Sequence, residues 1–176
     1  MSCKGTACTP SAKPSSFFNV FSQRTTTPPH FRYFYPMNST ELTALATQVR
    51  RDIVRMVHAV QSGHPGGSLG CTDLLVQLYF DTMNVSPDAF DMDGHGEDVF
   101  FLSNGHISPV WYSVLARRGY FLVEELSTFR KLNSRLQGHP ATEEGLPGIR
   151  VASGSLGQGL SVALGAAQVK SLNGED

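Results

Sequence analysis

The sequence predicts an α/β fold, with a mainly parallel sheet flanked by helices. Short apolar runs at 98–103 and 149–152 have the length and composition of buried strands. Each run is followed by a turn that contains glycine and then by a segment with helical periodicity, at 108–119 and at 158–172. Strands that alternate with helices in this way are typical of layered α/β domains.

Residues 1–36 differ from the rest of the chain. They are rich in Ser, Thr and Pro, contain Lys and Arg but no Asp or Glu, and show no apolar periodicity. This composition predicts a disordered extension over 1–36, ahead of a folded domain over 37–176. The same composition resembles an organellar transit peptide, and Met37 offers an alternative start directly before the folded pattern.

The folded pattern begins with an amphipathic helix. Asn38 or Ser39 can cap this helix, and Glu41 lies in its first turn. Apolar residues then recur every three or four positions as far as Val60. We therefore expect one face of this helix to be buried.

A loop is expected at 62–70, where the sequence reads SGHPGGSLG. Pro65 disfavours helical geometry at the residue before it, and the glycines favour other backbone conformations. The next helix is expected to begin at Thr72, whose hydroxyl can cap it. Further along the chain, we expect helices at 108–119 and at about 123–132.

The composition of the chain excludes several classes of protein. A formal net charge of −1 gives no basic surface for nucleic acid, and no run of apolar residues is long enough to cross a membrane. The three cysteines are odd in number and lack a Cys-x-x-Cys spacing, so they predict neither a disulfide framework nor a zinc site. We expect a cytoplasmic protein, with organellar targeting by 1–36 as the alternative.

Three histidines, His64, His106 and His139, stand beside glycine in predicted loops. In open α/β sheets, ligands bind beyond the carboxyl ends of the strands, and His106 follows such an end. Imidazole suits a site that moves protons, because its ordinary pKa lies close to neutral pH. A three-histidine zinc site is an alternative, although no acidic ligand stands with these residues. The other histidines, His30, His58 and His95, are expected to be exposed.

The loop at 153–159, with the sequence SGSLGQG, also follows the end of a predicted strand. Without Cβ atoms, its glycines would let the backbone approach a ligand closely, and the start of the following helix could receive phosphate oxygens. The alternative is that these glycines bind no ligand and only allow a tight turn between the strand and the helix.

Four motifs carry a resemblance to a known family. SGHPGGSLG, LSNGH, LQGHP followed by GLPGI, and SGSLGQG occur in this order. Between about Thr40 and Leu172, the chain resembles the amino-terminal thiamine-diphosphate-binding domain of transketolases. The resemblance implies the fold of this diphosphate-binding domain and a transferase of the pentose phosphate pathway. Such an enzyme transfers a two-carbon ketol unit from a ketose phosphate to an aldose phosphate through thiamine diphosphate.

The resemblance also implies roles for five residues. His64 and His139 would be catalytic residues that bind the donor sugar. His106 would be a catalytic residue that faces both the sugar and the diphosphate. Gly154 and Leu156 would bind the cofactor, with the Leu156 side chain against its rings.

The resemblance implies further protein as well. The ligands of the cofactor's Mg²⁺, and the domain that activates the cofactor, would follow Asp176, so we expect no metal ligand within the chain and no activity from the chain alone. Its partners would be sugar phosphates and carboxyl-terminal transketolase domains or a subunit, in a homodimer or heterotetramer. The alternatives are a related thiamine-diphosphate enzyme, such as dihydroxyacetone synthase or 1-deoxyxylulose-5-phosphate synthase, and a non-catalytic truncated domain.

Overall fold

A computed structural model of the chain describes residues 37–175. The extension expected at 1–36, and His30 within it, lie outside the described residues. The described residues all belong to one compact unit. No helix among them is both long enough and apolar enough to cross a membrane.

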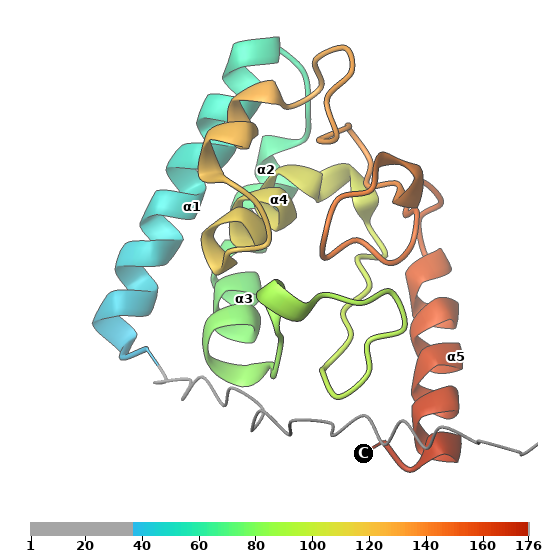
Figure 1. Cartoon of the computed structure of the whole chain (residues 1–176). Helices are drawn as coiled ribbons and strands as arrows, with labels where there is room; N and C mark the ends of the chain where they lie inside the picture. The colour runs from blue at the N-terminus through green and yellow to red at the C-terminus, as the bar shows by residue number, and fades with distance from the viewer. Residues whose placement is uncertain (1–36, 176) are drawn as a thin grey trace, which may run out of the picture. The chain divides into compact units, whose positions relative to one another are not determined.

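The described part of the chain forms α-helices joined by short 3-10 and π-helical turns (Figure 1). The α-helices are α1 (Ser39–Val60), α2 (Pro65–Gly70), α3 (Thr72–Gln77), α4 (Ser108–Arg118) and α5 (Gln158–Asn173). The π-helical turn η1 (Leu78–Thr82) extends α3, and the 3-10 helices are η2 (Pro87–Ala89), η3 (Gly105–Ile107), η4 (Val123–Thr128) and η5 (Thr142–Glu144).

The first helix, α1, begins at a capping box, as the sequence predicts. The Asn38 side chain accepts hydrogen bonds from the backbone N–H groups of Thr40 and Glu41, each at 3.0 Å. The Glu41 carboxylate accepts one from the Asn38 N–H at 2.9 Å. The helix packs against α3 and α4 through one buried face, made by Ala46, Val49, Asp52, Ile53 and Met56.

The fourth helix, α4, lies at the centre of the core, and its first nine residues are all buried. The Trp111 ring is fully buried, and its Nε1–H donates to the Tyr79 hydroxyl at 2.8 Å. The buried Asp52 carboxylate of α1 accepts hydrogen bonds from Ser113 Oγ at 2.8 Å and from Arg117 Nε at 2.6 Å. One buried carboxylate therefore ties α1 to α4.

Two local predictions near α2 are wrong. The stretch 62–70 is not wholly a loop, because Pro65–Gly70 form α2. Pro65 lies in the first turn of this helix, where its missing N–H is not needed. Thr72 does not cap α3, since Cys71 is the N-cap residue and the Thr72 hydroxyl donates to the Ser68 carbonyl at 3.0 Å instead.

The helix expected at 123–132 is also shorter than predicted, and it is the 3-10 helix η4. The chain leaves it at Arg130, whose φ is 55°. The Arg130 N–H donates to the Leu136 carbonyl at 2.8 Å, which closes a loop. Leu132 lies in this loop and is 93% exposed. The sequence places Leu132 at the end of the predicted helix, but the turn at Arg130 ends the helix before it.

The strands expected at 98–103 and 149–152 do not form in the described part of the chain, and the parallel sheet is therefore not confirmed. The predicted burial is confirmed for only one residue of each run, because Leu102 and Ile149 belong to the core and the other residues of the runs are partly or fully exposed. A strand needs a neighbouring strand to pair with its backbone groups. The surrounding helices cover these runs only in part and supply no such ladder.

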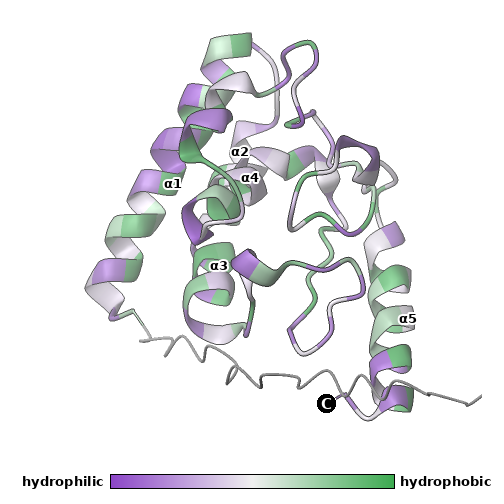
Figure 2. Ribbon diagram, in the orientation of Figure 1, coloured by the Kyte–Doolittle hydropathy of each residue, from purple (hydrophilic) through white to green (hydrophobic). Residues whose placement is uncertain are grey.

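The last helix, α5, exposes apolar side chains along its length, and Gly159 is its only buried residue. On its inner side, a Cβ added at Gly159 would lie 2.6 Å from Ser103 Cα, so the helix start touches the chain just before η3. Leu160, Leu164 and Leu172 are exposed to 67%, 65% and 77%, and hydrophobic residues recur along α5 (Figure 2). An apolar helix of this kind is usually covered by further protein.

Candidate functional site

The structure brings His64, His106 and His139 together. His64 directly precedes α2, His106 lies in η3, and His139 lies between η4 and η5. The rings of His64 and His106 meet edge to face, with centroids 5.0 Å apart and planes at 74°. His139 lies close enough to both for their charges to act on its pKa. His58 and His95 are exposed, as expected.

The start of α4 holds the loop that carries His139. The Ser108 hydroxyl donates to the Gly138 carbonyl at 2.9 Å, and the Tyr112 hydroxyl donates to the Gln137 carbonyl at 2.9 Å. Both donors belong to the buried part of α4. The backbone that carries His139 is therefore attached to the central helix of the core.

Two close contacts between site loops depend on glycine. A Cβ at Gly67 would lie 2.7 Å from Ile107 Cγ2, so α2 packs tightly against η3. A Cβ at Gly105 would lie 2.2 Å from the Ser153 carbonyl oxygen. The loop 153–159 therefore lies directly against the turn that carries His106.

Three buried polar atoms in these loops have no hydrogen-bond partner: His106 Nδ1, Arg130 Nε and Ser153 Oγ. No other buried side-chain nitrogen or oxygen among residues 37–175 lacks a partner. Leaving such an atom unpaired costs roughly 1–3 kcal/mol, so unpaired atoms are rare. Their presence around one group of histidines indicates a place where a polar ligand would pair with them.

Sequence reasoning missed Arg130 and Ser153. Ser153 opens the motif SGSLGQG, so its place beside the glycines could have been read from the sequence. The place of Arg130 in the site could not be read from the sequence, because the segment around it has the apolar spacing of a helix and gives no sign of the turn that forms there.

The pKa of His139 is lowered from its ordinary value near 6.5. The largest cause is desolvation of the ring by its neighbours, although the residue is exposed, followed by the positive charge of Arg130 and then by His106 and His64. His139 is therefore neutral at pH 7. A neutral imidazole has one N–H donor and one acceptor nitrogen, so it can both donate to an oxygen and take up a proton.

The two residues expected to touch a cofactor, Gly154 and Leu156, are both exposed. No atom lies within 4 Å of a Cβ added at Gly154, and Leu156 is 67% exposed. Because α5 begins at Gln158, its first turn lies at the end of the same loop; the Gln158 N–H donates to the Ser155 carbonyl, and the N–H groups that follow it have no partner within the helix. The loop thus offers open backbone, an apolar side chain and N–H donors.

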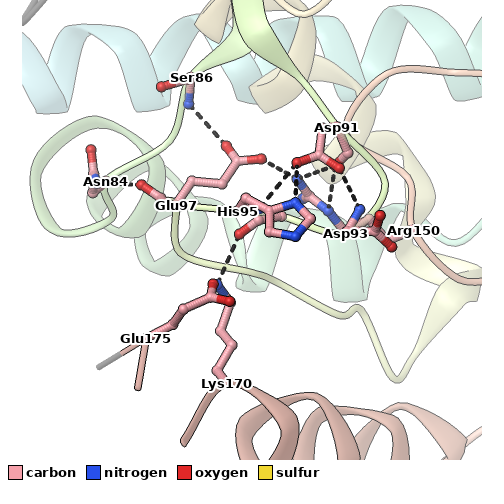
Figure 3. Close-up of polar contacts among 11 residues, drawn as sticks. Asn84, Ser86, Asp91, Asp93, His95, Glu97, Arg150, Lys170 and Glu175 are labelled. Atoms are coloured by element: carbon pink, nitrogen blue, oxygen red, sulfur yellow. Dashed lines mark hydrogen bonds and ion pairs between the residues drawn. The ribbon is translucent and has the colours of Figure 1, made fainter. Parts of the chain in front are cut away.

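A second group of polar residues lies in the loops before η3 (Figure 3). The Asp91 carboxylate accepts from the N–H groups of Asp93 at 2.7 Å and His95 at 3.1 Å, and contacts His95 Nδ1 at 3.0 Å. Arg150 pairs with the buried Glu97 and donates to the Asp91 carbonyl at 2.9 Å. Ligand atoms of Asp91, Asp93 and His95 lie within 4.8 Å of one another, but these hydrogen bonds already account for their arrangement as loop structure.

Comparison with known proteins finds relatives in sequence and in structure. Residues 42–175 match the family model described as "Transketolase, thiamine diphosphate binding domain". The transketolase of Buchnera aphidicola subsp. Acyrthosiphon pisum is 42% identical over 124 residues, which cover 70% of this chain and 18% of that protein. An apulose-4-phosphate transketolase subunit from Phocaeicola vulgatus is 38% identical over 127 residues, which cover 72% of this chain and 44% of that protein.

Among solved structures, the transketolase from Leishmania mexicana superposes with a TM-score of 0.65 at 34% identity. The match covers 70% of this chain and 18% of that one. The transketolase from Campylobacter jejuni gives the same TM-score and identity over 73% of this chain and 20% of that one. The chain therefore spans only about a fifth of the length of these solved relatives.

Proposed function

The chain belongs to the transketolase family, as a thiamine diphosphate binding domain, and on this premise we propose that it is the amino-terminal part of a transketolase. The complete enzyme would transfer a two-carbon ketol unit from a ketose phosphate to an aldose phosphate. The observation that best supports this proposal is the meeting of His64, His106 and His139 in one place. Because the chain spans 18% of the length of the Buchnera relative, the reaction needs further protein.

The residues of the site fit thiamine diphosphate. The unpaired Nδ1 of His106 can pair with a diphosphate or sugar oxygen. Gly154 leaves room for close approach to the backbone, and Leu156 offers an exposed apolar surface to a ring system. When bound, the cofactor supplies the thiazolium chemistry that stabilises a carbanion. We place the ligands of its Mg²⁺ beyond Asp176.

The sugar is assigned to His64 and His139. Both rings border the same space as His106, and each can hydrogen-bond a hydroxyl of the donor. The neutral His139 donates to an oxygen on which negative charge develops, or takes up a proton from a hydroxyl. His106 follows the apolar run 98–103, and its neighbour Gly105 lies against Ser153 of the loop 153–159, so we assign His106 to both sugar and cofactor.

Further protein would cover α5 and pair with the segment 98–103. The outward leucines of α5 support a covering partner. A cavity of about 350 Å³ between α5 and the preceding loops is lined by Val99, Phe101 and Ala163, among others. A strand of that further protein laid along 98–103 would give this segment the neighbour that a parallel sheet requires. Carboxyl-terminal domains or a second subunit, in a homodimer or heterotetramer, would supply the rest.

The test uses a chimaera in which residues 42–175 replace the corresponding segment of the Buchnera transketolase. His64→Ala and His139→Ala should lower turnover or raise the KM for the donor, with nearly unchanged cofactor affinity. His106→Ala should also weaken cofactor binding, by roughly tenfold to a hundredfold, because a hydrogen bond to a charged group is worth about 1.5–3 kcal/mol.

His95→Ala serves as the matched control, since His95 is exposed and pairs only locally with Asp91. Circular dichroism first confirms that each variant folds. Full two-carbon transfer by the triple histidine variant, or an equal loss of cofactor affinity in all three single variants, would refute the assignment.

A further inference from the structure

Arg130 lies between the loops that carry His64 and His139. Its Nη1 donates to Ser62 Oγ at 3.1 Å, two residues before His64. On the other side, a Cβ added at Gly138 would lie 2.5 Å from Arg130 Cζ and 2.8 Å from Nε. One guanidinium therefore spans the space from the first loop to the second.

The backbone directs Arg130 toward this position. Its φ of 55° lies in the left-handed region, which side chains other than glycine rarely adopt. The Arg130 Cζ lies 5.6 Å from the ring centroid of Phe129, which is buried in the core. Conformations of this kind persist where the surroundings impose them, and they concentrate at functional sites.

The charge of Arg130 is not neutralised within the described part of the chain. No carboxylate among residues 37–175 forms an ion pair with it, and its buried Nε has no hydrogen-bond partner. A buried guanidinium nitrogen normally finds an acceptor. The position thus has the properties of a fixed positive charge held for an anionic group.

We propose that Arg130 is a positioning residue, which joins the loop of His64 to the loop of His139 and supplies the fixed positive charge of the site. The identity of the group that this charge serves, an anionic sugar phosphate or diphosphate, rests on the proposed function. The joining of the two loops and the presence of a fixed positive charge do not depend on the proposed function, because they follow from contacts within the chain.

The charge acts through His139. A guanidinium beside an imidazole disfavours its protonated form, and it does so together with the other groups that face His139, which are His64 and His106. Arg130 therefore adds to desolvation, the largest cause, in favouring the neutral form of His139, which can both donate and accept a hydrogen bond. The close contact with Gly138 fixes the backbone from which that ring projects.

The test is a pH titration of the histidine ring signals by NMR, on the full chain of 176 residues. Arg130→Gln removes the charge and should raise the pKa of His139. Arg130→Lys keeps the charge and should leave that pKa near its wild-type value. Arg51→Gln is the control: it removes one positive charge from the exposed side of α1 and should leave the pKa of His139 unchanged.

Hydrogen exchange measured on the same samples tests the joining of the loops. Both Arg130 variants should exchange the amides of Ser62 and Ser153, which donate to the carbonyls of Val57 and Pro140 beside the two loops, faster by about tenfold or more, as expected for the loss of a hydrogen bond to a charged group. Arg51→Gln should not. This readout and the titration need neither cofactor nor activity, so they stand apart from the chimaera experiment.

An unchanged pKa of His139 in folded Arg130→Gln overturns the electrostatic role, and so does an equal shift in Arg51→Gln. If Arg130→Gln fails to fold, Arg130→Lys decides. Wild-type exchange at both Ser62 and Ser153 in the lysine variant overturns the proposal, and faster exchange with a retained pKa of His139 supports it.

Discussion

Replacing Gly105 by alanine tests the contact between the turn of His106 and the loop 153–159. The new Cβ would lie 2.2 Å from the Ser153 carbonyl oxygen, 2.5 Å from Ser153 Oγ and 2.8 Å from the Ser153 carbonyl carbon. To reach an ordinary contact of about 3.4 Å, the loop must withdraw by about 1.2 Å. Because the clash is with backbone, a change of side-chain rotamer cannot relieve it.

The expected cost in the free energy of unfolding is about 2–3 kcal/mol, in the upper part of the usual range for overpacking. Urea denaturation of the full chain, followed by Trp111 fluorescence, measures it. In the chimaera, a displacement of this size should also lower turnover by about a hundredfold, because a site loses its alignment when it moves by about 1 Å.

Gly165→Ala is the matched control. Gly165 lies within α5, and no atom lies within 4 Å of a Cβ added there. Alanine is a better helix former than glycine by roughly 0.5–1 kcal/mol, so this variant should be slightly more stable than the wild type. If Gly105→Ala proved as stable as the wild type, the two loops could not be in the contact described.

Three further changes test other parts of the fold. Asn38→Ala removes the capping box of α1 and should lower the free energy of unfolding by about 1 kcal/mol in urea, whereas Ser39→Ala should not. Asp52→Asn leaves Arg117, whose side chain is 19% exposed, without its carboxylate, and should cost about 2–3 kcal/mol in the same assay. Backbone hydrogen bonds from Asp93 and His95 lower the pKa of Asp91 to about 2. Because this folded value lies below the unfolded value, the stability that Asp91 contributes is present above about pH 3.8 and is lost as the pH falls through about 2. Urea midpoints measured between about pH 2 and pH 5 should therefore depend less on pH in Asp91→Asn than in the wild type.

The features that sequence predicted well have causes within a few residues of the chain. The capping box needs only Asn38 and Glu41, three positions apart, and it forms as expected. The buried face of α1 follows from the spacing of its apolar residues. Glycine alone does not distinguish the three histidines, because His95 also lies between two glycines; His64, His106 and His139 can be singled out because each falls within one of the four motifs, and their roles stay predictions.

The features that sequence did not predict depend on distant partners. The run 98–103 has the composition of a strand, but strand pairing needs a neighbour that the described helices do not provide. Arg130 has the spacing of a helical residue, but its backbone is left-handed and its N–H donates to the carbonyl of Leu136, six residues further along the chain. The unpaired Ser153 Oγ becomes visible only when the loop is packed against Gly105.

The most direct test of the site adds thiamine diphosphate to the full chain and follows the histidine ring and glycine amide signals by NMR. We expect weak binding that Mg²⁺ barely strengthens, with the largest shifts at His106 and Gly154 and none at the exposed His95. Shifts confined to His95, or no shift at His106 at any concentration, would contradict a cofactor-facing role for this group of histidines. Tight binding that depends on Mg²⁺ would instead place the metal ligands within the chain.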